Sequence, residues 1–502
     1  MLANCFYSRL LYLCGVVLIC GTCQPPLHEP PNILLAIADD WSWPHASIAG
    51  TPEIQTPAFD RIANEGILFP NAFCSAPSCT PSRGALLTGQ YHWRLENNAN
   101  LWSALEDRFQ VYPDLLERAG YKIGYTGKGW GPGMHEKGGR HRNPAGPEYN
   151  SVRTEVPPGM SQVDYYANFL LFLENKPEDQ PFCFWYGAFE PHRGYAAGRG
   201  IKLGKDPGNV DVPKCLPDHE SVRSDILDYY SEVEWFDRQL EKMIHYLEEI
   251  NELNQTIIII TSDNGMPFPR CKSNLYDLGT NVPLAIRWGI HPKKGRMVHD
   301  FISLTDLAPT ILEAAGLNIP EDMTGRSLMT FFKTRKEGLI ESERNAVLTG
   351  KERHAWVRQY GLGYPMRAIR THEFLYIYNF EPDRWPAGDP TKFENLRPSE
   401  PYGDIDGSPT KQYMLDHSHM IPNRFYLAFL KRPQEELYEL ETDPDQVVNL
   451  AIDPAYQDIR DMMHQRLMKA LKETNDPRIS GQGDMFDRMP YYNPGFLQNV
   501  PE

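Results

Sequence analysis

The sequence lacks an excess of positive charge. Its 50 lysines and arginines are outnumbered by 66 aspartates and glutamates, which gives a formal net charge of −16. Nucleic-acid binding depends on clustered lysine and arginine that neutralise phosphates, so we expect no nucleic-acid partner. The same deficit disfavours a broad surface for polyanions, and an anionic substrate would have to be bound by local positive groups in a pocket.

Long hydrophobic runs are also missing. An apolar run at residues 10–20 is too short for a membrane span. It follows Arg9 and precedes small residues before Gln24, a pattern typical of an export signal, so we predict a signal peptide over 1–24. We therefore expect an exported protein, periplasmic or extracellular in a bacterium and lysosomal or secreted in a eukaryote. Lipidation at Cys20 or Cys23 is the alternative for this segment.

Cysteine is scarce outside that leader. Of the nine cysteines, four lie within residues 1–24, and the others are Cys74, Cys79, Cys183, Cys215 and Cys271. The four thiols besides Cys79 would allow one or two disulfides in an oxidising compartment. The sequence also has no internal repeat, heptad pattern or low-complexity tract.

The chain instead contains alternating strands and helices. Continuous apolar runs at 32–38, 181–189 and 256–262 are typical of strands buried on both faces. Residues 56–66 have a capping threonine, an early proline and a terminal glycine, and 219–250 have an apolar stripe with helical period, so both segments predict helices. This alternation predicts a three-layer α/β sandwich with a mostly parallel central sheet.

The composition changes after residue 345. Segments 366–371 and 374–379 predict antiparallel strands, 381–420 a polar loop and 454–473 a helix. We interpret this part as a smaller α+β domain with a short antiparallel sheet. After the signal peptide, the predicted units are a large α/β domain at 25–345 and a C-terminal α+β subdomain at 346–502.

Oxygen-bearing side chains follow two of the predicted strands. Asp39 and Asp40 come directly after the first apolar run, and Asp263 and Asn264 come directly after the third. Ligand sites of open α/β sheets lie at the carboxyl ends of the strands, so these side chains can converge on one cation. Carboxylate and carboxamide oxygens suit calcium or magnesium better than zinc. For two adjacent aspartates alone, an ordinary polar strand end is the alternative.

A short helix is predicted to begin beside Cys79. Pro81 is a favoured residue of a first helical turn, and Gly89 lies where the helix would end. A cysteine at that position faces free backbone N–H groups and the positive end of a helix dipole, which lower a thiol pKa and suit anion binding. On this chemistry alone, a reactive cysteine and an ordinary capping residue are equal alternatives.

The pentapeptide Cys-Thr-Pro-Ser-Arg at 79–83 resembles the signature of the type I sulfatases, in which this cysteine is oxidised after synthesis to Cα-formylglycine. Further segments resemble landmarks of that family in the family's order, namely 32–40, 56–69, 79–90, 125–128, 191–192, 261–265 and 436–451. The resemblance implies the family's alkaline-phosphatase-like fold. Segments 190–194, 262–269 and 364–371 are most similar to the heparan N-sulfatase (sulfamidase, N-sulfoglucosamine sulfohydrolase) group.

The resemblance also implies a set of site residues. Those that match the ligands of one calcium ion are Asp39, Asp40, Asp263 and Asn264, together with residue 79, which also contacts the metal. Those that match the groups around the sulfate are Arg83, which steadies the aldehyde hydrate, Lys128 and Lys272, which bind sulfate, and His192, which lies beside the leaving-group oxygen or nitrogen. Fixed positive charge of this kind stabilises a transition state without reorganisation.

The implied mechanism uses the hydrated aldehyde at residue 79 as the nucleophile. One hydroxyl, activated by a metal-linked carboxylate such as Asp263, attacks sulfur and displaces an alcohol or amine, which His192 protonates. The other hydroxyl then collapses to the aldehyde and expels sulfate from the sulfated-enzyme intermediate. A formylglycine-generating maturation enzyme is therefore an expected partner.

Two positions depart from the family pattern. The family often has a histidine two residues after the lysine of its Gly-Lys motif, where this chain has Trp130, and it commonly has Leu-Tyr-Glu where this chain has Leu275, Tyr276 and Asp277. His135 is a candidate to replace the missing histidine. The departures leave the second acid/base histidine open.

The resulting hypothesis is an exo-acting sulfatase that removes the N-sulfate of terminal N-sulfoglucosamine from heparan-type glycosaminoglycans. The acidic charge favours the exo mode, because the chain lacks a basic groove for a long polyanion. His354 and Arg367 are predicted sugar contacts from the second domain, with ordinary surface polarity as an equal alternative.

Other functions remain as alternatives. They are an exo-O-sulfatase for another sulfated glycan, a phosphoester or phosphonate hydrolase of the same fold, and an unmodified, catalytically silent carbohydrate-binding relative. A homodimer is among the oligomeric states left open.

Overall fold

A seven-stranded sheet lies at the centre of the larger part of the protein. The computed structural model describes residues 30–289, 295–391 and 400–494. The strand order is β4-β5-β1-β6-β7-β2-β8. The parallel strands are β4 (Lys122–Gly127), β5 (Phe182–Gly187), β1 (Asn32–Ala38) and β6 (Thr256–Ser262). Beyond them lie β7 (Leu284–Arg287), which is antiparallel to both neighbours, β2 (Ile67–Leu68) and β8 (Arg296–Met297). The predicted mostly parallel sheet is confirmed.

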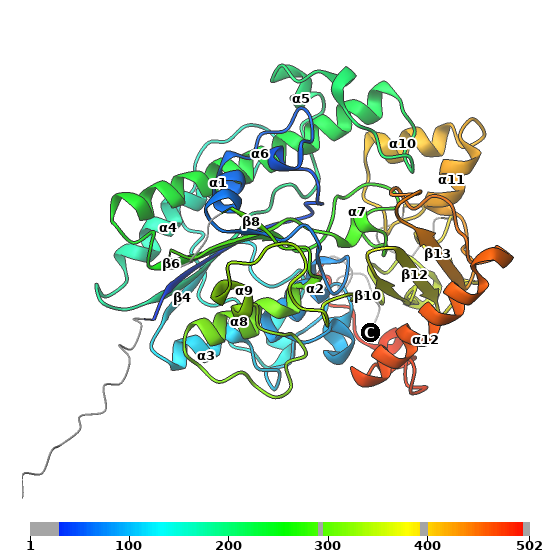
Figure 1. The fold of residues 1–502 in the computed structure, drawn as a ribbon. Coiled ribbons are helices and arrows are strands. Elements are labelled where there is room, and N and C mark those ends of the chain that lie inside the picture. The colour runs from blue at the N-terminus through cyan, green and yellow to red at the C-terminus, as the bar shows by residue number, and fades with distance from the viewer. Residues whose placement is uncertain (1–29, 290–294, 392–399, 495–502) are drawn as a thin grey trace, which may run out of the picture.

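Helices cover both faces of this sheet (Figure 1). One face carries α1 (Pro57–Glu65), α4 (Tyr165–Glu174) and α6 (Glu220–Glu249), and the other carries α2 (Cys79–Thr88), α3 (Tyr112–Arg118), α8 (Leu307–Ala314) and α9 (Met329–Lys333). Within β1, Leu34 and Ala36 face the first layer, and Ile33 and Leu35 face the second. Because both faces are covered, β1 is apolar from Ile33 to Ala38. The three-layer sandwich is therefore confirmed.

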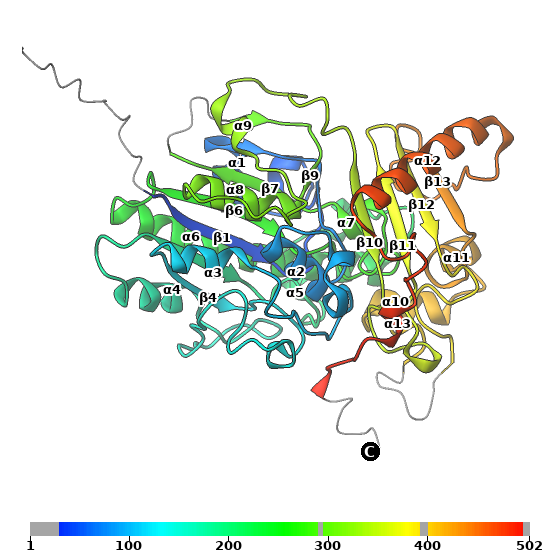
Figure 2. The same ribbon diagram turned by 90° about the horizontal axis from the view of Figure 1, so that it is seen from below.

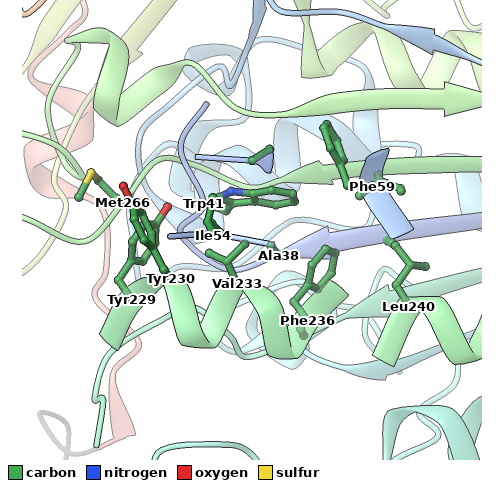
Figure 3. Close-up of a cluster of buried hydrophobic side chains, with 14 of the residues drawn as sticks. Ala38, Trp41, Ile54, Phe59, Tyr229, Tyr230, Val233, Phe236, Leu240 and Met266 are labelled. Carbon is green, nitrogen blue, oxygen red and sulfur yellow. The ribbon is translucent and has the colours of Figure 1, made fainter. Parts of the chain in front are cut away.

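An aromatic cluster fixes the chain just beyond the end of β1 (Figure 3). Trp41 packs edge-on against Phe59 of α1 at 5.2 Å between ring centroids, and against Phe236 of α6 at 5.8 Å. Its backbone N–H donates to the Ser262 hydroxyl at 2.7 Å, at the end of β6. Fully buried aromatic side chains contribute about 1.5–3 kcal/mol each to stability. The two aspartates directly before Trp41 are consequently held in a fixed position.

A second, antiparallel sheet lies beside the first (Figure 2). Its order is β10 (Val347–Lys351), β11 (Met366–Arg370), β12 (Phe374–Asn379) and β13 (Glu435–Glu439). Helix α12 (Gln457–Glu473) covers one face through Met463, Leu467 and Leu471. The other face packs on Leu275 and Tyr276 from the loop that follows β6. The predicted smaller α+β part is confirmed, whereas its boundary at residue 345 stays a prediction.

The segment predicted as a polar loop at 381–420 contains a helix, so that prediction is wrong at its C-terminal end. Helix α10 spans Pro409–Asp416, and the Ser408 hydroxyl caps it by accepting from the Lys411 N–H at 3.0 Å. The helix is only two turns long, and the Thr410 hydroxyl ties it to α6 by donating to Asp225 at 2.6 Å. Tertiary contact stabilises such short helices, and a local pattern does not reveal it. Helix α11 (Pro422–Phe429) follows.

The five cysteines within the described residues are all buried and unpaired. The sequence would allow one or two disulfides, but none is formed among these five cysteines. The predicted signal peptide and its cysteines lie outside the described residues. In the described ranges, no helix is long and apolar enough to cross a membrane.

Glu232 on α6 should make the stability of the protein depend on pH. Both of its carboxyl oxygens are buried without a hydrogen-bond partner among the described residues. Burial and the nearby Glu190 raise the pKa of Glu232 to about 8, against an ordinary value of about 4.3 in an unfolded chain. The folded protein thus holds this proton more tightly, and the stabilisation is largest below about pH 4 and is lost by about pH 8.

We expect Glu232→Gln to flatten this part of the stability profile, because glutamine has the same shape and no titrating proton. The measurement is the Tm of both proteins from pH 5 to pH 9, where the gap in favour of the variant should widen as pH rises. Glu249→Gln, on the exposed side of the same helix, is the control. Parallel Tm curves for wild type and Glu232→Gln would contradict the assignment.

Candidate active site

The four predicted metal ligands meet at the carboxyl edge of the large sheet. Strands β1 and β6 are parallel and paired as far as Ala38 and Ser262, so the residues that follow them lie side by side. The Asp40 N–H donates to Asp263 at 3.1 Å, and the Asn264 carboxamide donates to Asp40 at 2.7 Å. All of these side chains are buried. Asp40 has a φ of 81°, a left-handed conformation that is uncommon for a residue with a side chain and that clusters at functional sites.

Residue 79 begins helix α2 and points at this edge. Its Sγ lies 3.5 Å from Asp39 Oδ1. One turn later, Arg83 donates from Nε to Asp263 at 2.7 Å and from Nη1 to the carbonyls of Lys128 and Gly129 at 2.9 Å. The arginine therefore joins three segments, which are helix α2, the end of β6 and the end of β4.

The environment of Cys79 overturns the expectation of a lowered thiol pKa. Burial raises the pKa of the Cys79 thiol well above its usual range, and the nearby Asp39 adds to the rise, although Lys128 opposes it. Desolvation by the surrounding layers outweighs the helix dipole, because burial disfavours the charged form of a thiol. An unmodified Cys79 is therefore a neutral thiol and a poor nucleophile.

Two lysines bind the two adjacent aspartates, Asp39 and Asp40, at the end of β1. Lys128, directly after β4, has its Nζ 2.6 and 2.8 Å from the two Asp39 oxygens. Lys272, in the loop after β6, has its Nζ 2.6 Å from Asp40 Oδ2. Although burial opposes it, Lys128 and the other cations hold the pKa of Asp39 well below its usual range. The site thus combines the ionised Asp39 carboxylate with positive charge that the fold holds in place.

The residues fit a hard divalent cation. One ligand atom each from Asp39, Cys79 and Asp263 lies within 4.8 Å of the others. The carboxamide oxygen of Asn264 is buried at the same place and has no hydrogen-bond partner among the described residues. An orphaned, buried oxygen in a residue that contacts a carboxylate of the site is typical of a metal ligand, and an oxygen-rich set of this kind suits calcium or magnesium.

His192 reaches the site from the loop after β5. Its Nδ1 lies 2.6 Å from the Arg193 carbonyl oxygen, so Nδ1 is the hydrogen-bond donor, and its Nε2 lies 3.9 Å from Asp40 Oδ2. Arg193 anchors the loop through two hydrogen bonds to Asp225 at 2.8 and 2.9 Å. The tautomer and direction of the imidazole are fixed in this way, with Nε2 turned towards the carboxylates.

His354 lies next to the site. Its Nδ1 is 2.8 Å from the hydroxyl of Ser78, the residue that precedes Cys79. Burial lowers the pKa of His354 to about 3, so the imidazole is neutral at physiological pH. The geometry is compatible with the predicted sugar contact, which stays a prediction.

Arg367 does not lie in the site, and its prediction as a sugar contact is wrong. The side chain is fully buried within β11, where it pairs with Glu352 at 2.7 Å and with Asp476 at 2.5 Å. The guanidinium is therefore bound by two carboxylates inside the C-terminal part of the protein and is not free to contact a sugar. The pattern of a strand shows that its residues alternate between two faces, but it does not show which face a helix covers.

We expect Arg367→Met to lower the free energy of unfolding by about 3–5 kcal/mol, because it removes the guanidinium that pairs with the buried Asp476 carboxylate and leaves Glu352 paired with Arg478 alone. The KM of the folded enzyme should not change, since the side chain cannot reach a substrate. Urea unfolding and initial rates measure the two effects. Arg460→Met removes a solvent-accessible pair with Asp461 on α12 and should change the stability far less. A raised KM with unchanged stability would restore Arg367 to the binding site.

The structure adds a residue that the sequence does not reveal. Asp406 has a carboxylate oxygen 3.4 Å from Lys272 Nζ, and one of its oxygens lies within 4.8 Å of ligand atoms of Asp40 and His192. No family landmark marks this position, and it lies in the segment predicted as a polar loop. Its approach to the site depends on tertiary packing.

The position of the missing second histidine is filled by an aromatic residue. Trp130 is buried, and its indole N–H donates to Asn98 at 2.8 Å. This side chain has no group for acid/base catalysis. His135 has its Nε2 3.4 Å from its chain neighbour Glu136. That His135 replaces the missing acid/base histidine stays a prediction.

Comparison with known protein families gives this geometry a context. A family model described as Sulfatase matches residues 31–317, which is more than half of the chain. The chain belongs to the sulfatase family. As a sulfatase it is a sulfuric ester hydrolase, and its predicted family membership is confirmed. A second model, described as N-sulphoglucosamine sulphohydrolase, C-terminal, matches residues 271–417.

Individual relatives align with most of the chain. N-sulphoglucosamine sulphohydrolase of Homo sapiens is 29% identical, with 93% of this chain and 94% of that protein aligned. An ulvan-active sulfatase of Formosa agariphila is 27% identical, with 90% and 82% aligned. A solved structure described as a complex with its substrate D-glucosamine-2-N,6-O-disulfate has a TM-score of 0.62 at 20% identity, with 89% of this chain and 99% of that chain covered. The structural likeness shows the alkaline-phosphatase-like fold.

Proposed function

We propose that this sulfatase removes the N-sulfate from terminal N-sulfoglucosamine in heparan-type chains, with residue 79 acting as formylglycine. The observation that carries the proposal is the arrangement of Lys128 and Lys272, whose Nζ atoms are held on the buried carboxylates of Asp39 and Asp40, with residue 79 in contact with Asp39. Two fixed ammonium groups beside the nucleophile suit the oxygens of a sulfate group. The similarity to N-sulphoglucosamine sulphohydrolase over 93% of the chain supports the choice of sugar.

Each side chain has a role that its contacts support. Lys128 and Lys272 bind the sulfate oxygens, and residue 79, as the aldehyde hydrate, presents its hydroxyl to sulfur. Arg83 donates from Nε to Asp263 at 2.7 Å and so holds this carboxylate near residue 79. A calcium ion bound by the carboxylate and carboxamide oxygens would neutralise charge that develops on the sulfate. His192, whose Nδ1–H is committed to a backbone carbonyl, donates a proton from Nε2 to the departing nitrogen when the ring is in its doubly protonated imidazolium form, and it returns to the neutral Nδ1–H tautomer.

The supporting experiment compares sulfate release from three substrates under one set of conditions. They are N-sulfated glucosamine, 6-O-sulfated N-acetylglucosamine and a polymer with internal sulfates only. We expect the first to be the best substrate and the polymer to be inert. Release from the 6-O-sulfated sugar alone would remove the N-sulfatase proposal and retain the sulfatase, and fast release throughout the polymer would overturn the exo mode.

A further inference from the structure

Asp406 lies between two anchors that fix its position at the mouth of the site. Two residues earlier, Asp404 is buried and binds Arg358 at 2.6 Å and Lys351 at 3.1 Å, and it also accepts the Ala355 N–H at 3.0 Å. Two residues later, Ser408 caps helix α10. With both flanks held, the Asp406 carboxylate has a defined place beside the sulfate-binding groups.

Asp406 belongs to the outer layer of the site. Its side chain is 31% exposed, whereas that of Lys272 is 5% exposed and that of Asp40 is fully buried. Although burial opposes it, Lys272 and the nearby Arg193 hold the pKa of the Asp406 carboxyl well below its usual range. The group is therefore an ionised, solvent-reachable acceptor that no part of the proposed chemistry uses.

In a bound substrate of the proposed kind, Asp406 would lie beside the sugar ring and not beside the sulfate group. A sulfate bound by Lys128, Lys272 and residue 79 occupies the buried layer, and its leaving group faces His192 Nε2. The ring attached to that leaving group must then extend outward, past His192 and towards the exposed carboxylate beside it. An ionised carboxylate accepts hydrogen bonds from hydroxyl groups and repels other anions.

We propose that Asp406 is a specificity-determining residue that accepts a hydrogen bond from a free hydroxyl of the sugar carrying the scissile sulfate and disfavours sugars with a second sulfate at that position. This inference rests on the proposed function, because it presumes that a sulfated sugar occupies the site. It adds a selection rule: a sugar that is sulfated once on the ring is preferred to the same sugar sulfated twice.

The test uses Asp406→Asn, which keeps the shape and removes the charge. Values of kcat/KM are measured for N-sulfoglucosamine, for its 3-O-sulfated and 6-O-sulfated derivatives, and for 4-methylumbelliferyl sulfate, which has no sugar ring next to the sulfate. We expect wild type to disfavour at least one doubly sulfated sugar, and we expect the variant to reduce that preference on the order of tenfold. The kcat/KM for N-sulfoglucosamine should fall more than that for the aryl sulfate, mainly through KM.

A matched control removes the negative charge of another carboxylate in the same segment, Glu400. Glu400 has a side chain that is 61% exposed and lies 4.0 Å from Lys411, so Glu400→Gln should leave all four values unchanged. If Asp406 only positioned Lys272, Asp406→Asn would lower the sugar and aryl-sulfate values by the same factor. That result, or an unchanged preference between singly and doubly sulfated sugars, overturns the inference.

Failure of the proposed function gives a different result. If wild type cleaves the aryl sulfate but no N-sulfate, the N-sulfatase proposal fails. The preference is then measured between 6-O-sulfated N-acetylglucosamine, which carries one sulfate, and 6-O-sulfated N-sulfoglucosamine, which carries two. This pair tests Asp406 through release of the 6-O-sulfate and does not require cleavage of the N-sulfate. A thermal unfolding curve of each variant confirms that the compared proteins are folded.

Discussion

Cys79→Ala is expected to lower sulfate release by about four orders of magnitude or more, because removal of a covalent nucleophile has effects of this size. The fold should survive, since the polar contact that the thiol makes among the described residues is a long one of 3.5 Å to Asp39, and alanine is compatible with the first turn of α2. Initial rates and Tm measure the two properties. Full activity in the variant would exclude residue 79 as the nucleophile.

A second buried cysteine provides the control for this substitution. Cys183 lies in β5, and burial raises the pKa of its thiol as it does for Cys79. Cys183→Ala should cost a comparable amount of stability and retain activity. The mass of the tryptic peptide that contains residue 79 shows in parallel whether wild type carries a thiol or an aldehyde there. A fully active wild type with an intact thiol would contradict the mechanism, because the structure makes that thiol neutral and buried.

The convergence of the four predicted metal ligands could be foreseen from the sequence because it depends on local pattern and on one topological rule. The apolar runs at 32–38 and 256–262 define buried strands, and parallel strands place the residues after them at the same edge of the sheet. The pairing of Ala38 with Ser262 confirms this expectation. The lysines and His192 lie at the ends of strands or in the loops that follow them, for the same reason.

The parts that could not be predicted depend on contacts between distant segments. Asp406 reaches the site because Asp404 pairs with Arg358 and because α10 packs on α6, and neither interaction leaves a periodic signal. Arg367 is buried because α12 and the segment around Asp476 cover one face of its strand. The thiol pKa of Cys79 differs from expectation because a helix dipole is a local property, whereas burial is set by the whole fold.

Removal of divalent metal is expected to abolish activity and to lower the Tm. The predicted calcium ligands Asp39, Asp40 and Asp263 are buried close together, and Lys128, Lys272 and Arg83 are positive side chains that pair with them. A cation that binds only the folded protein stabilises it by RT ln(1 + [L]/Kd), which is about 2.7 kcal/mol at one hundred times Kd. Chelation removes this contribution together with the positive charge that faces the sulfate.

The measurement combines metal analysis, thermal unfolding and sulfate release, before and after treatment with a chelator. We expect one ion per chain, a fall in Tm on chelation, and recovery of both Tm and activity with calcium and less with magnesium, which demands a stricter geometry. Asn264→Ala removes the orphaned carboxamide oxygen without changing the charge, so it should shift the calcium dependence of Tm to higher concentration. Asn168→Ala, at a buried carboxamide that bonds the Val152 and Asp164 carbonyls, should lower stability without that shift. Purified protein that is fully active with no divalent metal would refute the metal site, whatever the effect of either substitution on Tm.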